Sequence, residues 1–225
     1  MNGWTPASKL ILFTIILSAC VLIWDRESLF SFRQTVTETF DGDDPDLILA
    51  GPVDLAVKEA LEWDFSVSDG RFVLENRSAP KSAFYKDIEW VRYDGSDNLV
   101  STNLANISVT VTSDDRGRGG AGVFVGSGQR GRYWMFCIDG NGHYFVLNKS
   151  GRKVKTAFSG SHAAIHPDKA NRVALERQED KIVFLANDVE IIQVPMKNWK
   201  GKLDGVGLGA FGKGSYTFDD LKISQ

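Results

Sequence analysis

From about residue 62 onward, apolar and polar side chains alternate with a period of two, and this pattern most constrains the fold. In the stretch Asn106–Ser113, NISVTVTS, every second residue from Ile107 is aliphatic, and the residues between are Ser or Thr. An extended chain with this pattern buries one face and exposes the other. Similar short runs rich in β-branched and aromatic residues follow: GAGVFVG, RYWMFCI, HYFVLN, NRVALER, KIVFLA and VEIIQV. The sequence therefore predicts a chain of short strands with almost no helix.

Turn-forming residues separate these runs. Asp139-Gly140-Asn141-Gly142, Glu179-Asp180 and Asn187-Asp188 each stand between two predicted strands. Asn, Asp and Gly tolerate positive φ, so they suit tight connections between antiparallel strands. Many short antiparallel strands without helices predict an all-β, two-sheet antiparallel sandwich.

Two of the runs have further features. RYWMFCI is apolar at nearly every position, which predicts a central strand that is covered on both faces. In GVGLGAFG, glycines alternate with apolar residues, so bare backbone lies on one face and another layer can approach closely there. Cys137, within RYWMFCI, is expected to be a buried and unreactive thiol.

The N-terminal segment KLILFTIILSACVLIWD, residues 9–25, contains an apolar run from Leu10 to Trp24 that carries no charge. With the preceding residues it is long enough to cross a thin bilayer, so residues 1–25 are predicted to form a tail and one transmembrane helix. Its anchoring side chains are Leu10, Ile11, Phe13, Ile16, Leu17, Val21, Leu22 and Trp24. LSAC is similar to a bacterial lipobox, which makes Cys20 a candidate for lipidation; a cleaved signal is the remaining alternative.

Residues 26–61 are predicted to be a juxtamembrane linker, and residues 62–225 one domain. The linker holds Gly, Pro and a cluster of acidic residues: Asp41, Asp43, Asp44 and Asp46. Clustered carboxylates can bind Ca²⁺, but Pro45 and the misplaced glycine break the EF-hand pattern. We expect a solvated acidic turn and no metal site.

Four segments together resemble the concanavalin A-like lectin/glucanase jelly roll: WDFSVSDGRFVLEN, GAGVFVGSGQRGRYWMFCIDGNGHYFVL, NRVALERQEDKIVFLANDVEII and GVGLGAFGKGSYTFDDLKI. Within it, they look most like laminin-G-like modules and 3-keto-disaccharide hydrolase-type domains. The likeness runs in order from about Glu62 to Ile223. It implies a jelly-roll sandwich, but the superfamily includes lectins, glycosidases and pure interaction modules, so it does not imply one function.

The sequence does not reveal a set of catalytic residues. Family 16 glycosidases of this fold carry Glu-x-Asp-x-x-Glu on one strand; here Glu62 and Asp64 have no following acid at the right place. His162 and His166 have a spacing that could bind a metal on a helix, but Pro167 favours a loop. His143 follows a turn and has no partner that the sequence identifies. We therefore predict that the protein is not an enzyme and has no metal site or cofactor.

A binding role has a candidate in the polar segment MKNWKGK. Trp199 could stack on a sugar, and the flanking Lys197 and Lys200 would equally suit an anionic lipid or protein. The formal charge of −3 and the pI of about 5.7 argue against nucleic acid, which requires a basic face.

These features together predict a non-catalytic, membrane-anchored subunit that stabilises a larger membrane complex, such as a bacterial respiratory or photosynthetic complex. The anchor would lie in the bacterial inner membrane as a single span with the domain in the periplasm, and the partners would be the membrane and the other subunits. The first alternative is a surface-anchored carbohydrate-binding module with a glycan as partner. The second is a glycoside-cleaving enzyme.

Overall fold

The computed structural model describes residues 35–41, 63–77, 88–92, 105–114, 119–127, 132–150, 153–198 and 205–224. All of them belong to one compact unit, Gln34–Gln225. Among these residues no helix has the length and apolar character needed to span a membrane. The predicted anchor in residues 1–25 and Cys20 lie outside the described residues.

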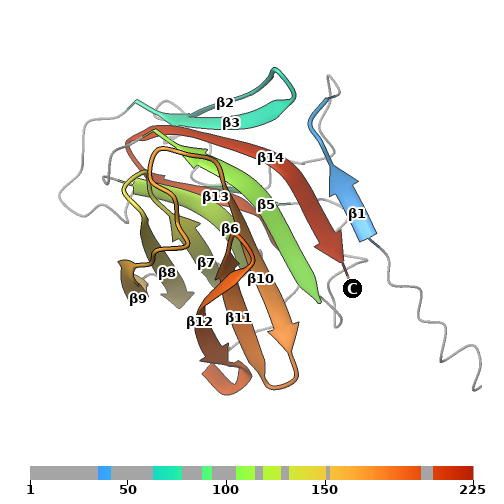
Figure 1. Ribbon diagram of the computed structural model, residues 1–225, viewed down its shortest axis with the longest axis vertical. Helices are drawn as coiled ribbons and strands as arrows, with labels where there is room; N and C mark the ends of the chain where they lie inside the picture. Colours follow the sequence, from blue (N-terminus) through green and yellow to red (C-terminus); the bar gives the residue numbers. More distant parts are fainter. Residues whose placement is uncertain are drawn as a thin grey trace, which may run out of the picture. The chain divides into compact units, whose positions relative to one another are not determined.

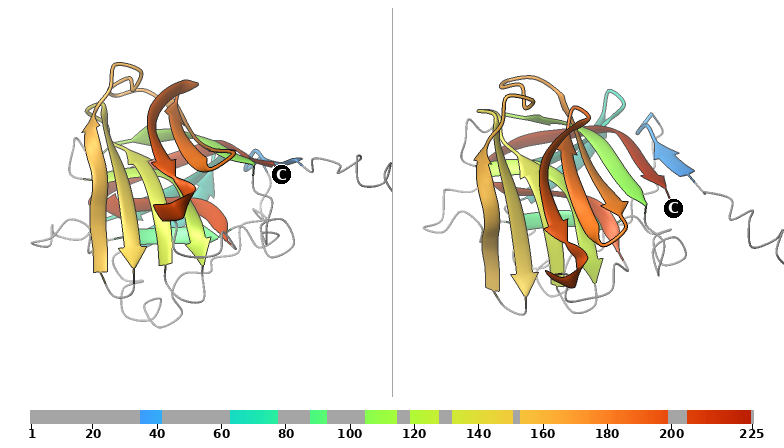
Figure 2. Two further views of the ribbon diagram at one scale, coloured as in Figure 1. Left: turned by 90° about the horizontal axis from the view of Figure 1, so that it is seen from below. Right: turned by 60° about the horizontal axis from the view of Figure 1, so that its bottom comes forward.

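The fold is a sandwich of two antiparallel sheets (Figures 1 and 2). We call the larger one sheet A; it pairs its strands in the order β12-β11-β10-β5-β14-β3-β2, and β1 also pairs with β14. The strands are β1 (Thr35–Glu38), β2 (Trp63–Ser68), β3 (Arg71–Asn76), β5 (Asn106–Ser113), β10 (Asn171–Gln178), β11 (Lys181–Ala186), β12 (Val189–Pro195) and β14 (Gly214–Ser224).

Sheet B has six strands in the order β4-β13-β6-β7-β8-β9. They are β4 (Ile88–Arg92), β6 (Gly119–Ser127), β7 (Arg132–Ile138), β8 (His143–Ser150), β9 (Lys153–Ser161) and β13 (Val206–Gly212). A short 3-10 helix, η3 (Met196–Asn198), follows β12. The predicted all-β jelly-roll sandwich is therefore confirmed.

Alternation in the sequence determines which side chains fill the space between the sheets. In β5, Ile107, Val109 and Val111 are completely buried, as the period of two predicts. The rings of Phe136 on β7 and Phe184 on β11 lie 4.9 Å apart, centre to centre, and join the two sheets. Burial of large apolar side chains from both sheets supplies the main stabilising free energy of the sandwich.

The face of sheet B that points away from sheet A is also apolar, and we call it the outer face. Tyr133, Met135 and Cys137 of β7 lie on this face and are buried, together with Phe124 and Phe211. The prediction that RYWMFCI is covered on both faces is confirmed. Consequently the outer face is closed to a ligand along β6, β7 and β13.

Strand β1 lies within the segment that we predicted to be a linker. It pairs with the C-terminal part of β14, from Thr35 opposite Ser224 to Glu38 opposite Leu221 (Figure 1). Phe40, which follows it, is 1% exposed and contacts Phe72 of β3 with ring centres 5.9 Å apart. Residues 35–41 thus pack as part of the sandwich.

Candidate functional site

A shallow hollow of about 350 Å³ lies at one end of the sandwich. The turn between β7 and β8 and the loop between β9 and β10 form it, and its lining residues are Asn141, Gly142, Ser161, His162, Ala163, Ile165 and Pro167. Asn141 is an exposed side chain at the rim, whereas Ile165 is buried and gives the hollow an apolar part. Sites for small ligands combine apolar surface with a few fixed polar groups in this way.

Asn171 holds the loop that forms the hollow. This side chain is 2% exposed and makes two hydrogen bonds to His166, accepting from its N–H at 2.7 Å and donating to its carbonyl at 2.9 Å. It also donates to the carbonyl of Lys169 at 2.8 Å. The loop backbone has no neighbouring strand to hydrogen-bond to here, and the buried amide of Asn171 supplies these hydrogen bonds instead.

Asn187, in the tight turn between β11 and β12, extends this network. Its side-chain amide donates to the carbonyl of Ala164 at 2.7 Å and to Oδ1 of Asn171 at 2.8 Å. Its own oxygen accepts from the N–H of Arg172 at 2.8 Å. Asn187 adopts a φ of 49° in this turn, and Asn tolerates a positive φ better than most residues. The wall of the hollow is therefore attached to the end of sheet A, through β10 and the β11–β12 turn.

His162 lines the hollow, and one hydrogen bond determines the tautomer of its neutral ring. The N–H of Ala164 donates to Nδ1 of His162 at 3.2 Å, so the neutral ring carries its proton on Nε2. Nε2 is then a hydrogen-bond donor available to a ligand. The backbone turn closes at the same place, because the N–H of Ile165 donates to the carbonyl of His162 at 3.0 Å.

A second histidine lies next to the hollow with the opposite tautomer. Oδ2 of Asp139 lies 2.9 Å from Nδ1 of His143, and the Asp139 side chain is 1% exposed. Oδ1 of Asp139 accepts the N–H groups of Asn141 at 2.9 Å and His143 at 2.7 Å. A carboxylate only accepts, so Nδ1 of His143 carries a proton, and in the neutral ring Nε2 keeps its lone pair. The His143 side chain is 48% exposed.

The structure places the other predicted residues as follows. His166 is an exposed side chain in the loop before β10, where we expected a loop, and its backbone is bound by Asn171. Asp168 has a φ of 55° in the same loop. No three described His, Cys, Asp or Glu side chains are grouped so that they could hold a metal ion.

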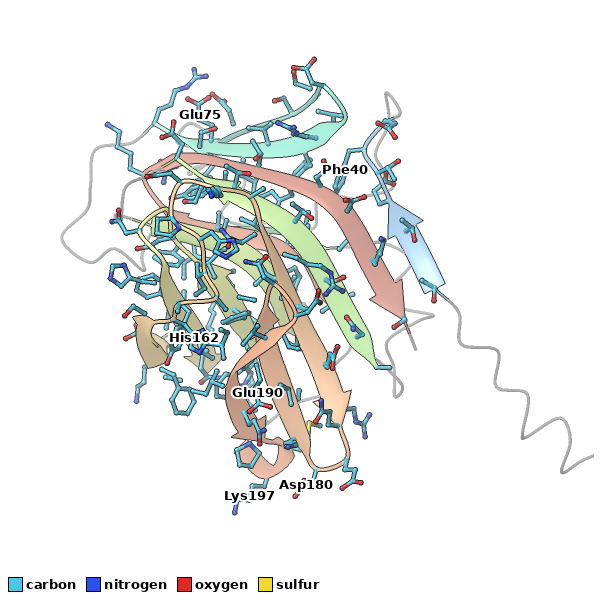
Figure 3. The ribbon with its side chains drawn as sticks, in the orientation of Figure 1. Phe40, Glu75, His162, Asp180, Glu190 and Lys197 are labelled. Carbon is cyan, nitrogen blue, oxygen red and sulfur yellow. The ribbon has the colours of Figure 1, made fainter. Side chains whose placement is uncertain are left out.

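The predicted contact residues lie elsewhere. Lys197 is exposed in η3, near the turn between β10 and β11, where the N–H of Met196 donates to the carbonyl of Asp180 at 2.6 Å. This turn is at the opposite end of β12 from Asn187, and Figure 3 shows Lys197 and His162 well apart. Trp199 and Lys200 lie outside the described residues, as do Glu62 and three of the four clustered aspartates.

Asp64, which the glycosidase pattern singled out, is a solvated side chain. It is exposed on β2 and lies 3.3 Å from the guanidinium of Arg77. Arg77 also donates to Glu75 at 2.8 Å, and this hydrogen bond lowers the pKa of Glu75. These charges form an exposed ion-pair group on sheet A, which contributes little to stability.

Reasoning from sequence missed the partners of His143. The tight turn brings Asp139, four residues earlier, beside its ring, and strand pairing places Ser161 of β9 directly opposite it. The spacing Asp-Gly-Asn-Gly-His was visible as a turn signal, but the pairing of residues 143 and 161 depends on the register of β8 and β9. A bulge near Val146 shifts that register.

The fold is shared with several solved structures. The catalytic domain of a laminarinase from Thermotoga maritima matches with a TM-score of 0.57 at 10% identity, covering 86% of this chain and 98% of that one. A β-1,3-1,4-glucanase (lichenase) from a mouse hindgut metagenome matches with a TM-score of 0.56 at 10% identity, covering 84% and 98%. A protein of unknown function with a galectin-like fold from Bacillus subtilis matches with a TM-score of 0.55 at 9% identity, covering 86% and 98%.

These likenesses show that the described domain has the concanavalin A-like fold, as the resemblance implied. At such low identity they extend to the fold and not to particular residues. No protein-family model matches the chain, and no curated protein sequence matches it.

The similar structures contradict two predictions. We expected a non-catalytic subunit of a membrane complex and no enzyme, but structures with this fold include glucanases and an endo-β-galactosidase. They favour the alternatives, a carbohydrate-binding module or an enzyme. The error has a physical cause: we searched for acids and histidines close together in sequence, whereas this site is assembled from separate turns and strands.

Proposed function

We propose that this chain binds carbohydrate in the hollow between the β7–β8 turn and the β9–β10 loop. The observation that carries the proposal is the combination of rigid polar groups with an apolar wall in one open depression. His162 offers a donor at Nε2, and Ser161 offers a hydroxyl that both donates and accepts. Ile165 and Pro167 supply apolar surface.

A sugar ring matches this arrangement chemically. Each ring has hydroxyl groups that need hydrogen-bond partners when water is removed, and C–H groups that pack against apolar surface. The hollow is shallow and open. It can therefore hold one or two units of a sugar chain that extends beyond it, whereas a small molecule that needs a closed pocket would fit less well. The buried network around Asn171 keeps the loop in one conformation, which reduces the entropy lost on binding.

The fold is consistent with this proposal. A laminarinase and a lichenase with the same fold act, by their names, on β-linked glucans. Both are only 10% identical to this chain, so their residues do not indicate where a ligand would bind here. The proposed location and ligand class therefore rest on the residues of the hollow.

The test is binding of the full-length chain to a glycan array, followed by calorimetric titration with the best oligosaccharide. His162→Ala removes the Nε2 donor, and we expect it to weaken binding about tenfold, the effect of one hydrogen bond. Lys197→Ala is the control. Lys197 is exposed in η3, at the end of β12 that lies away from Asn187 and the hollow, so its loss should leave the affinity unchanged.

Two results would contradict the proposal. One is the absence of saturable binding to any glycan. The other is binding that Lys197→Ala or Trp199→Ala abolishes while His162→Ala leaves it intact, which would move the site to the segment around η3.

A further inference from the structure

Three side chains lie in a row across the ends of three neighbouring strands on the outer face of sheet B. Asp139 directly follows β7, His143 begins β8, and Ser161 ends β9. Sheet B pairs these strands in the order β7-β8-β9, so the imidazole lies between the acid and the hydroxyl. Side chains two residues apart on a strand share a face. Cys137, two residues before Asp139, and Phe145, two residues after His143, both belong to the outer-face cluster, so Asp139 and His143 lie on the outer face.

The pairing of His143 with Ser161 brings their side chains close. The two residues are directly opposite each other in the antiparallel register. The nearest backbone hydrogen bond joins the neighbouring residues: the N–H of His162 donates to the carbonyl of Gly142 at 3.4 Å. His143 and Ser161 are therefore a pair whose own backbone groups are not hydrogen-bonded to each other. In such a non-hydrogen-bonded pair the Cβ atoms are about 4.5–5.5 Å apart, and side chains approach most closely.

The acid fixes the ring in the orientation that a base requires. Asp139 is buried and holds Nδ1–H of His143 at 2.9 Å on the β7 side of the ring. In the neutral ring Nε2 keeps its lone pair on the side of the imidazole away from Nδ1, and β9, which carries Ser161, is the neighbour of β8 on the side opposite β7. An acid, an imidazole and a hydroxyl in this order are the arrangement that activates a serine for acyl transfer.

From this geometry we infer that Ser161, His143 and Asp139 form a hydrolytic site for acyl esters on carbohydrate. The inference rests on the proposed function, because Ser161 also lines the hollow that holds the sugar. Ser161 and His143 are the catalytic residues, and Asp139 is a positioning residue. An O-acylated sugar hydroxyl is the substrate class.

The reaction needs only water as its second reactant. Oγ of Ser161 attacks the ester carbonyl carbon while Nε2 of His143 accepts its proton. The bond from the carbonyl carbon to the sugar oxygen then breaks, and His143 gives the proton to that oxygen. Water attacks the acyl-serine with His143 as base, the carboxylic acid leaves, and the proton returns to Oγ.

The test is covalent labelling of the full-length chain with a fluorophosphonate probe, with the adduct located by peptide mass spectrometry, and turnover of 4-nitrophenyl acetate. We expect the adduct on Ser161. Ser161→Ala should abolish labelling, and His143→Gln should slow it about a hundredfold, since general-base assistance is removed. Ser159→Ala is the matched control, another exposed serine on the same face of β9, opposite Phe145, and should label normally.

Asp139→Asn separates positioning from structure. Asn can still accept both turn N–H groups through Oδ1, so the free energy of unfolding should change little. Its NH₂ group instead donates to Nδ1 and forces His143 into the other tautomer, which nitrogen NMR of the ring detects, and labelling should fall with it.

The inference is overturned if wild-type protein gives no adduct on Ser161, or if His143→Gln labels as fast as wild type. In either case, calorimetric binding of an unacylated oligosaccharide that His162→Ala weakens would leave the proposed function standing. Loss of that binding together with absent labelling would remove both.

Discussion

At the scale of single residues, Asn171 contributes most clearly to the candidate site. It is buried and contacts the loop backbone and Asn187. Asn171→Ala leaves several of these groups without a partner, so we expect the free energy of unfolding to fall by roughly 3 kcal/mol. Urea denaturation followed by tryptophan fluorescence measures the change.

Asn141→Ala is the control for this prediction, because Asn141 is exposed at the rim and should change stability by no more than about 0.5 kcal/mol. A loss of equal size in the two variants would mean that the Asn171 network does not hold the loop.

Cys137 gives a prediction that depends on pH. Burial raises the pKa of its thiol well above the usual value, so at pH 8 the native protein keeps the thiol protonated. The thiolate is the reactive form, so iodoacetamide should not alkylate Cys137 in native protein at pH 8. In urea at the same pH the thiol is exposed, its pKa returns to the ordinary range, and alkylation should become rapid.

Mass spectrometry of the peptide that contains Cys137 distinguishes it from Cys20. Rapid alkylation of native Cys137 would show that the outer face of β7 is open, contrary to the buried cluster around Met135 and Phe211.

At the scale of elements, the close approach of β6 to β7 depends on Gly122. A Cβ atom at this position would lie 2.0 Å from the carbonyl oxygen of Phe136, which is backbone and cannot move aside. Gly122→Ala should therefore lower the free energy of unfolding by roughly 3 kcal/mol, the upper end for overpacking.

Gly160→Ala is the matched variant on β9. Its Cβ would meet the ring of the half-buried Tyr144 at 3.1 Å, and the end of a side chain can shift by a few tenths of an ångström where backbone cannot. We expect a cost of about 1 kcal/mol or less. Equal costs in thermal denaturation of the two variants would count against the tight β6–β7 pairing.

Individual strands were predictable from sequence because burial on one face enforces alternation. NISVTVTS became β5, where Ile107, Val109 and Val111 are buried as expected, although Ser108 on the other face is buried too, and RYWMFCI became β7. The pairing of Asp139, His143 and Ser161 was not predictable, because it depends on a turn hydrogen bond and on a bulged register between β8 and β9. β1 was also missed: its four residues are partly exposed, and only pairing with β14 orders them.

At the scale of the whole molecule, the fold and the function require separate arguments. The concanavalin A-like sandwich follows from alternation, turns and two apolar layers, and the similar structures confirm it. The function depends on which groups the turns bring to one end of that sandwich. The membrane anchor in residues 1–25, with its position in an inner membrane, stays a prediction.

The most direct measurement of the carbohydrate-binding claim is hydrogen exchange, read by mass spectrometry, on the full-length chain with and without the oligosaccharide chosen from the array. Ligand contact should slow amide exchange in peptides covering residues 139–143 and 161–168, while the peptide covering 194–198 stays unchanged. Protection confined to residues 194–198, or no protection at saturating ligand, would contradict a binding site in this hollow.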